Sequence, residues 1–238
     1  MDPDIAPVER HHHRDVQGGA ARAAVFGFGD GLTTNVGLIL GVAGANSTSK
    51  VVQLSGLLGL VAGAVSMAAG EYNSMRVQQE LIQRELDLER IALDRFPHVE
   101  TVELTQIYQA RGVDADQARA LAEAMMSDPD RALEAHAREE LGISPDGLGS
   151  PLQAAFSSCI SFALGAMVPL VPWFIGTGTA AKIGSVVAAL VAAVVVSMAT
   201  ARFTGRSRAR TVLRQLVVVS GAVTITYVLG TIAGGVIG

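Results

Sequence analysis

The side chains most suited to chemistry in this 238-residue chain are carboxylates, and they occur in two unlike settings. One of them, Asp30, stands alone inside the apolar stretch FGFGDGLTTNVGLILGVAGA, residues 26–45. A carboxylate within a membrane span is costly, so it normally faces a protein interior or a water-filled path. The sequence therefore predicts a cation or proton site at Asp30, with a structural helix–helix hydrogen bond or a position near the membrane interface as the alternative.

A second candidate ligand is Met67, which lies in an apolar segment whose small residues share one helical face. Taken alone, it is a packing residue. Opposite Asp30, its thioether would place soft sulfur beside a carboxylate, a combination that suits a transition metal better than Mg²⁺ or Ca²⁺. The carboxylate would then hold a metal ion or a proton but disfavour both together, which is the minimal chemistry of an antiporter.

The other setting is the acidic segment 76–150, where possible ligands recur three or four residues apart, on single helix faces. The groups are Glu85 with Glu89, Glu100 with Glu103, and His136 with Glu139 and Glu140. Carboxylates at this spacing chelate a divalent cation when several helices converge, and a solvated helix face is the alternative for each pair. The run HAREE, residues 136–140, is the strongest candidate because it adds a nitrogen ligand.

Long apolar stretches supply the frame for these side chains. They lie near 20–45, 51–72, 152–175, 180–201 and 212–237. Each has the roughly 20 residues that a helix needs to cross a bilayer. Half of the residues are hydrophobic and only 17% are charged, which argues against an ordinary soluble domain. We therefore predict an all-α integral membrane protein with five transmembrane helices and a cytoplasmic helical domain between helices two and three.

Domain boundaries follow from the same pattern. The expected parts are a polar N-terminal segment (1–19), transmembrane helices one and two (20–75), a cytoplasmic helical metal-binding domain (76–150) and transmembrane helices three to five (151–238). Helical periodicity continues without a break beyond Glu71, so the second span should extend out of the membrane until Pro97 ends it. Three shorter helices are predicted over 99–112, 114–126 and 128–142, from their caps and closing glycines.

Orientation follows from the link between the last two spans, which carries Arg202, Arg206, Arg208, Arg210 and Arg214. The positive-inside rule places this link in the cytoplasm. Counting back through alternating spans puts the N-terminus and residues 76–150 in the cytoplasm and Gly238 outside. We expect the location to be the cell membrane.

An enzyme is not predicted. A membrane hydrolase needs a nucleophile and a base together, yet all histidines lie outside the spans, at positions 11, 12, 13, 98 and 136. No phosphate-binding loop of the G-x-x-x-x-G-K-[ST] type occurs, so an ion gradient would supply the work. No nucleic-acid partner is expected. A non-transporting, membrane-anchored metal-binding scaffold or sensor is the rival function. Whether the histidines at 11–13 collect metal stays open.

Several blocks resemble the vacuolar iron transporter family, in its bacterial branch. They are DGLTTNVGLILGVAGA, GLLGLVAGAVSMAAGEYNSMRVQQE, IYQARG, AHAREELGI and SFALGAMVPLVPWF. The resemblance covers about residues 11–237. It implies a five-span homodimer that moves Fe²⁺, often also Mn²⁺, out of the cytosol in exchange for protons, with no tightly bound cofactor. It also implies an ion path at the dimer interface and a three-helix cytoplasmic domain that binds metal before transport.

In the membrane part, this resemblance carries two path residues over to this chain. Asp30 matches the family's first-span carboxylate and Met67 its second-span methionine. Gly59 stands where eukaryotic members place a glutamate, eight residues before that methionine. The departure leaves open a weaker site, a different metal, a substitute such as Glu71, or lost transport, and it is the best support for the scaffold reading.

In the cytoplasmic domain, the resemblance implies a ligand set at Glu89, Glu100, Glu103 and Glu140. Two positions depart from the family pattern. Ala92 replaces an expected acid, and His136 stands where a methionine is usual.

Overall fold

The computed structural model describes residues 19–143 and 149–237, and these ranges contain eight helices and no strand. The helices are α1 (Gly19–Gly44), α2 (Ser49–Arg95), α3 (Pro97–Ala110), α4 (Ala115–Met126), α5 (Pro129–Glu139), α6 (Pro151–Ile175), α7 (Gly178–Thr204) and α8 (Arg208–Ile237). Five of them, α1, α2, α6, α7 and α8, are long and apolar enough to span a membrane. The predicted all-α membrane fold is confirmed. The histidines at 11–13 lie outside the described residues.

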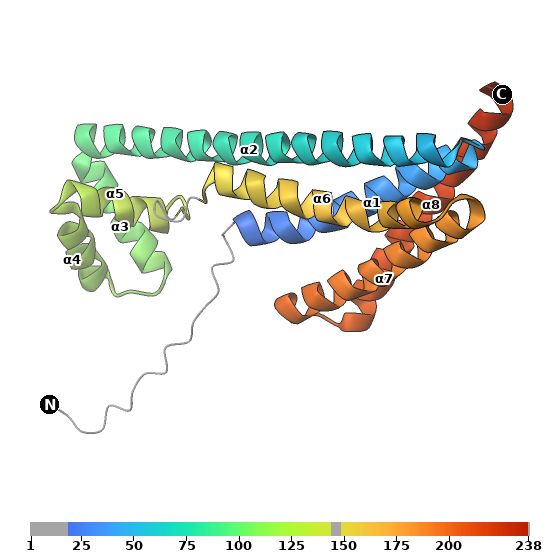
Figure 1. Cartoon of the computed structure of the whole chain (residues 1–238). Coiled ribbons are helices and arrows are strands. Elements are labelled where there is room, and N and C mark those ends of the chain that lie inside the picture. The colour runs from blue at the N-terminus through green and yellow to red at the C-terminus, as the bar shows by residue number, and fades with distance from the viewer. Residues whose placement is uncertain (1–18, 144–148, 238) are drawn as a thin grey trace, which may run out of the picture.

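The longest element is α2, one continuous helix of 47 residues (Figure 1). At 1.5 Å per residue it extends about 70 Å, more than twice the roughly 30 Å of membrane hydrocarbon. Its first half is apolar and its second half is polar, so it carries the chain from the membrane into water. The helix ends at Arg95, and Pro97 begins α3. This is the predicted end, because a residue before proline is driven out of helical geometry.

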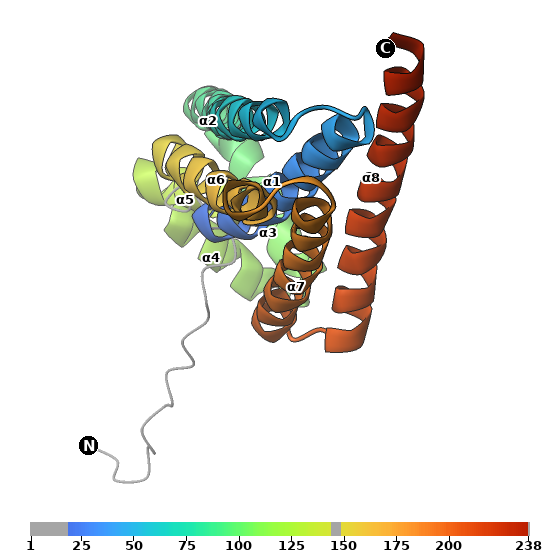
Figure 2. The ribbon, with the colours of Figure 1, turned by 45° about the vertical axis from the view of Figure 1, so that its right-hand side comes forward.

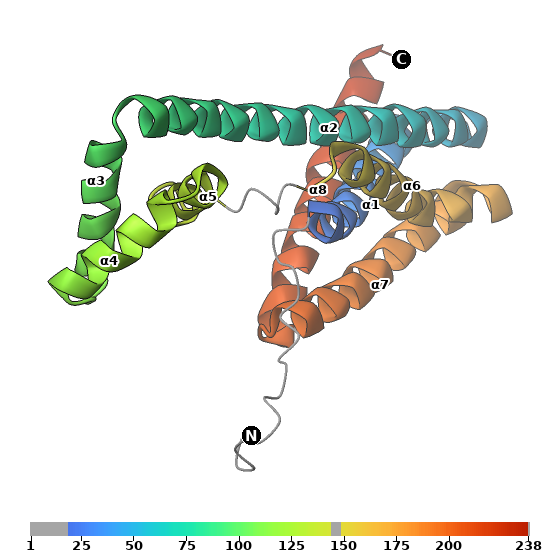
Figure 3. The same cartoon turned by 90° about the vertical axis from the view of Figure 1, so that its left-hand side faces the viewer.

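Helices α3, α4 and α5 form a separate group at the polar end of α2 (Figure 3). Their starts are set locally. The Asp114 carboxylate accepts a hydrogen bond from the Asp116 amide, and the Asp128 carboxylate accepts one from the Arg131 amide. Leu104 of α3 and Ala122 of α4 are buried in the core between these helices. The group therefore holds α5 back against the polar part of α2.

Glycines bring the spanning helices close together. A Cβ on Gly31 of α1 would overlap the carbonyl oxygen of Phe162 on α6, and α1 and α8 meet in the same way at Gly41 and Gly230. At these positions the glycines of the first span let two helix backbones approach closely. Helix α6 packs against both α1 and α2, whereas α8 stands at the edge of the bundle (Figure 2).

The G-x-x-x-G pair of α2, Gly59 and Gly63, faces side chains and not a helix backbone. A Cβ on Gly59 would overlap the end of the Leu38 side chain, and one on Gly63 would overlap the Phe162 ring. These glycines accommodate side chains of neighbouring helices and do not bring two backbones together. Their role is to seat α2 against α1 and α6.

Candidate functional site

A buried histidine surrounded by carboxylates lies where α2, α3 and α5 converge. The Nδ1 atom of His136 is 3.1 Å from Glu89 Oε1, 3.3 Å from Glu140 Oε2 and 3.9 Å from Glu100 Oε2. Ligand atoms of Glu89, Glu100 and His136 lie within 4.8 Å of one another. We call Glu89, Glu100, His136 and Glu140 the acid–histidine cluster. Residues far apart in sequence thus meet as a divalent cation site requires.

Electrostatics in the acid–histidine cluster favour an added cation. His136 is fully buried, and Glu89 and Glu100 are each 8% exposed. Burial is the main cause that raises the pKa of both carboxyls, the charges of Glu103 and Glu140 raise it further, and His136 opposes the shift. Three carboxylates therefore surround one imidazole, and a divalent ion would supply the missing positive charge.

Hydrogen bonding leaves possible ligand atoms free in this cluster. The His136 Nδ1 atom is hydrogen-bonded to Glu140 at 3.3 Å. The His136 Nε2 atom and the Glu89 Oε1 atom are both buried without a hydrogen-bond partner among the described residues. Although Glu89 Oε1 lies close to Nδ1, the pair lacks hydrogen-bond geometry. Buried polar atoms without partners are rare in proteins, and a bound ion is one way in which such atoms are satisfied.

Two further residues of the expected ligand set lie beside the cluster. Glu103 is exposed on α3, and its charge still acts on both buried carboxyls. Glu139 forms an ion pair with Arg111, which also donates a hydrogen bond to the Glu139 carbonyl oxygen at 3.1 Å. The structure thus directs Glu140 toward His136 and Glu139 toward Arg111.

The second candidate site is a cavity of about 320 Å³ in the spanning part, formed by α1, α2 and α6. We call it the Asp30 cavity. Its lining residues are Phe26, Asp30, Thr34, Gly63, Ser66, Met67, Gly70, Glu71 and Phe162. Met67 therefore lies opposite Asp30, which is the condition under which its thioether becomes a candidate ligand. Glu71, one helical turn beyond Met67, brings a second carboxylate to the same cavity.

The two carboxylates of the Asp30 cavity have different partners. Glu71 forms an ion pair of 2.6 Å with Arg22, whose side chain is largely exposed. Asp30 accepts one long hydrogen bond, of 3.4 Å, from Thr34 Oγ1, and pairs with no cation among the described residues. A contact of that length is weak. Asp30 is therefore the carboxylate with the greater unused capacity to bind.

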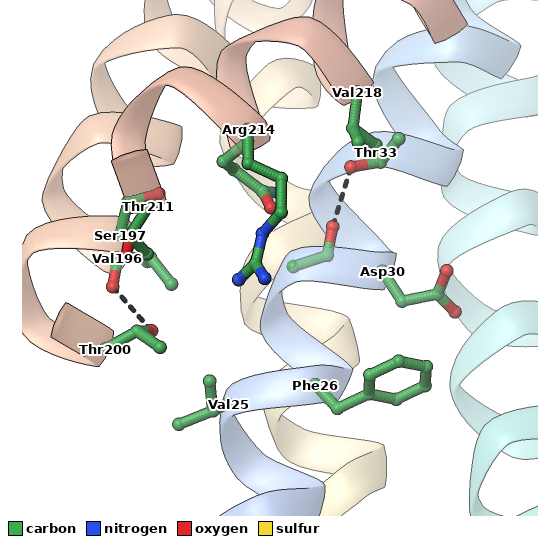
Figure 4. Close-up of a pocket in the computed structure, with 12 residues that line it drawn as sticks. Val25, Phe26, Asp30, Thr33, Val196, Ser197, Thr200, Thr211, Arg214 and Val218 are labelled. Carbon is green, nitrogen blue, oxygen red and sulfur yellow. Dashed lines mark hydrogen bonds between the residues drawn. The ribbon is translucent and has the colours of Figure 1, made fainter. Parts of the chain in front are cut away.

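A neighbouring cavity of about 300 Å³ lies on the other side of α1, against α7 and α8. Asp30 and Arg214 both contribute to its lining. Figure 4 shows the Arg214 guanidinium pointing into this cavity, whereas the Asp30 side chain points away from it, toward α2. Asp30 is therefore not the counter-ion of Arg214, and its charge is directed to the Asp30 cavity.

Gly59, where an acid was expected, faces a polar residue that sequence reasoning missed. Asn35 of α1 is fully buried, and its Nδ2 atom donates to the Ala166 carbonyl oxygen at 2.7 Å. Its Oδ1 atom has no hydrogen-bond partner within the described ranges and would lie 3.0 Å from a Cβ on Gly59. The signal that would have found it is an amide side chain inside an apolar span.

Comparison with known proteins agrees with this arrangement. Residues 21–231 match the family model described as the VIT family. The chain is 32% identical over 171 residues to "Vacuolar iron transporter 1" of Eucalyptus grandis, covering 71% of this chain and 69% of that one. It is 36% identical over 183 residues to "Vacuolar iron transporter" of Acanthamoeba castellanii, covering 74% and 66%.

A third relative, "Vacuolar iron transporter" of Centaurea cyanus, is 30% identical over 182 residues, covering 76% of this chain and 74% of that protein. These matches extend across the spanning helices and the polar helices alike. They confirm the family resemblance seen in the sequence blocks, and the chain belongs to the VIT family, as a multi-pass membrane protein.

Proposed function

We propose that this protein exports Fe²⁺, and also Mn²⁺, from the cytosol across the membrane in exchange for protons. The observation that carries the proposal is the Asp30 cavity, where Asp30, Met67 and Glu71 meet within the spanning helices. The relatives are named as iron transporters, which supports iron as the cargo. Asp30 follows Arg22, at the charged end of the span, by eight residues, which corresponds to about 12 Å along α1. The carboxylate therefore lies within the span and not at its end.

Proton coupling rests on the chemistry of a single carboxylate. Asp30 has no cation partner of its own among the described residues, so its negative charge can be satisfied by a metal ion or by a proton. The two would compete for the same oxygens. A proton arriving from the acidic side would therefore release the metal ion, and the proton gradient would drive transport. Met67 would favour a transition metal over Mg²⁺ or Ca²⁺.

The acid–histidine cluster would capture metal before transport. It lies outside the spanning part, and its carboxylates and imidazole are suitable ligands for Fe²⁺ and Mn²⁺. Helix α2 connects it rigidly to the Asp30 cavity, because Glu89 and Glu71 belong to the same unbroken helix. Their separation of 18 positions corresponds to about 27 Å. Metal captured at the cluster would thus be released on the same side of the membrane as the entrance of the path, about 27 Å from Glu71.

We further propose a homodimer with the path near its interface. Helix α2 exposes a run of apolar side chains beside the Asp30 cavity, including Leu58, Val61 and Val65. Such a face suits either lipid or a second copy of the chain, and the dimer would complete the wall of the cavity. Cross-linking through a single cysteine introduced at Val61 or Val65, in a Cys159→Ser background and in membranes, would test it. Absence of a covalent dimer at both positions would contradict this interface.

Orientation and location are proposals as well. The arginine-rich link between α7 and α8 favours a cytoplasmic acid–histidine cluster and an extracytoplasmic C-terminus. We place this chain in the cell membrane; the word vacuolar belongs to the names of the relatives. A reporter fused after Gly238 should behave as extracytoplasmic and one inserted near Gly147 as cytoplasmic. Reporters that give the same side would contradict the five-span arrangement.

The decisive experiment is metal flux in proteoliposomes. Fe²⁺, Mn²⁺, Co²⁺ and Zn²⁺ would be compared with and without a pH gradient. Asp30→Asn keeps the size and hydrogen bonding of the side chain but removes its charge, so coupled flux should be lost, while Asp30→Glu should retain part of it. Asp116→Asn, the same change at an exposed position on α4, is the matched control. Normal coupled flux in Asp30→Asn would remove this carboxylate from the mechanism.

The same assay separates transport from the rival function. A membrane-anchored metal scaffold or sensor would bind metal at the acid–histidine cluster without moving it. Gly59 favours that reading because one expected acid is missing, whereas Glu71 in the Asp30 cavity opposes it. Metal binding by the wild-type chain without any flux would establish the scaffold.

A further inference from the structure

The link between α7 and α8 concentrates positive charge without any acid nearby in sequence. Its arginines are Arg202, Arg206, Arg208, Arg210 and Arg214, and no Asp or Glu follows Asp146 in the chain. Among the described residues, none of these five arginines forms an ion pair with a carboxylate. Their charge is left for water or for a ligand.

Three of these arginines line one cavity. It has a volume of about 580 Å³ and lies between the end of α7 and the start of α8. Arg206, Arg210 and Arg214 are among its lining residues, Arg214 being shared with the neighbouring cavity of Figure 4, and residues with hydroxyl side chains, Ser207 among them, make up most of the rest. We call it the arginine cavity. Guanidinium and hydroxyl groups together provide the hydrogen-bond donors that bind phosphate oxygens.

Backbone geometry fixes the arginine cavity in place. Gly205 ends α7 with φ 65°, a left-handed conformation that glycine adopts without strain. The Arg206 amide then donates to the Ala201 carbonyl oxygen at 3.2 Å, which folds the link back over α7. Arg210 and Arg214 are four residues apart and so share one face of α8. The three cations are thereby gathered from a turn and a helix.

The surroundings of the arginine cavity place it at a membrane surface. Exposed apolar side chains flank it on both helices, namely Phe203 on α7 and Leu213 and Val217 on α8. These would contact acyl chains, while the arginines would lie at the level of the lipid headgroups. In a five-span arrangement, the chain leaves the side of the acid–histidine cluster through α6 and returns to it through α7.

We propose that the arginine cavity binds the phosphate headgroup of an anionic lipid in the leaflet on the same side as the acid–histidine cluster. Its volume exceeds what a single phosphate fills, so a headgroup with its glycerol backbone fits. Basic pockets between transmembrane helices are suited to such headgroups. The lipid is favoured over a soluble phosphate because the apolar flanks would bind its chains at the same time.

A purely topological role for the arginines makes a different prediction. Orientation by the positive-inside rule depends on the number of positive charges, which lysine preserves. A phosphate site depends on the planar fork of arginine, which lysine lacks. Paired Arg→Lys changes therefore separate the two roles without altering the net charge of the chain.

The test compares two double variants of the full-length protein in neutral detergent. Arg206→Lys with Arg210→Lys changes the arginine cavity, and Arg202→Lys with Arg208→Lys is the matched control outside its lining. Native mass spectrometry would measure binding of phosphatidylglycerol and of phosphatidylcholine with the same acyl chains. We expect wild type and control to prefer phosphatidylglycerol and the cavity variant to bind it about tenfold more weakly, equivalent to about 1.4 kcal/mol.

Specific outcomes would overturn the proposal. Equal phosphatidylglycerol binding by the two double variants would leave the arginines with a topological role alone. Equal binding of the two lipids by wild type would remove the preference for anionic headgroups. Glycerol phosphate and inorganic phosphate form the second arm of the experiment. If either displaces phosphatidylglycerol at an equal concentration, the occupant is a soluble phosphate and the lipid assignment is wrong.

Discussion

Replacing Glu89 by glutamine should make the metal-free protein more stable and the metal-bound protein less so. The reason is the crowding of negative charge around His136. Glu89 and Glu100 are buried, with ligand atoms no more than 4.8 Å apart. At an effective dielectric constant of about 20, two charges at that separation repel by roughly 3.5 kcal/mol. A glutamine at this position would remove the repulsion while keeping the shape of the side chain.

Part of that gain is lost again. The amide gives up the attraction between the carboxylate and His136, and water relaxes around the remaining charges. A net increase of about 1–2 kcal/mol at pH 7 in the free energy of local opening is the expected result. The increase should shrink as the pH falls toward the ordinary pKa of a glutamate, 4.5, because the wild-type carboxyl then becomes protonated and neutral.

Hydrogen exchange of the full-length protein in detergent measures this directly, through the amides of α5. Glu80→Gln is the control, since Glu80 lies on the same helix in an exposed pair with Arg76. Added Mn²⁺ should protect wild type strongly and Glu89→Gln weakly, because one anionic ligand is gone. Lower protection of metal-free Glu89→Gln than of wild type at pH 7, persisting at low pH, would refute the repulsion argument.

Three further outcomes are expected. Because burial raises the pKa of Glu89 and Glu100, the native metal-free state holds protons more tightly than the unfolded state. The stability of the metal-free protein should therefore fall as the pH rises from 4.5 through the raised pKa values. In thermal unfolding scans, Mn²⁺ should reduce that loss of stability. Gly31→Ala should abolish folding or cost several kcal/mol, since its Cβ meets the α6 backbone, whereas Gly70→Ala, with open space around it, should match wild type in yield and melting temperature. Gly59→Glu should lower both the melting temperature and the Mn²⁺ flux, because the added side chain would displace Leu38 and bring a carboxylate to the unpaired Oδ1 atom of Asn35. An unchanged melting temperature would show that Leu38 moves aside at little cost.

Helix positions could be predicted from the sequence because their signals are local. Pro97 ends one helix and begins the next, and Asp114 and Asp128 accept hydrogen bonds from amides only two or three residues away. Such caps act within one turn, so their residue types and spacing suffice. The same holds for the five spans, where length and hydropathy alone identify the elements.

Ligand directions in the acid–histidine cluster could be predicted only in part. Spacing places Glu139 and Glu140 equally well for His136, three and four residues along the helix. The structure separates them because Arg111, at the end of α3, contacts Glu139. That neighbour comes from another helix, so no pattern within α5 reveals it.

Contacts between distant spans could not be predicted from the sequence either, because the contacting residues come from different helices. The pocket shared by Asp30 and Arg214 depends on how α8 crosses α1, and the buried amide of Asn35 depends on α6. Small residues permit many crossings, and which crossing forms is decided by the fit of whole helices. Sequence predicted that Asp30 would face a protein interior or a water-filled path, and the structure shows which of two neighbouring cavities it faces.

The absence of an acid at Gly59 changes how the proposed path would hold its ion. If Glu71 is the substitute, it lies twelve residues further along α2, so the second carboxylate would move about 18 Å toward the acid–histidine cluster. The ion would meet both path carboxylates, Asp30 and Glu71, near the entrance, and Met67 lines the same cavity. Beyond that point, the described residues beside Gly59 offer only the neutral oxygen of Asn35. A neutral oxygen binds a divalent cation far more weakly than a carboxylate does, so the deeper half of the path would not trap the ion once a proton had displaced it from Asp30. Affinity would be concentrated at the entrance, where the proton competes, and passage through the deeper half of the path would involve no further titrating acid.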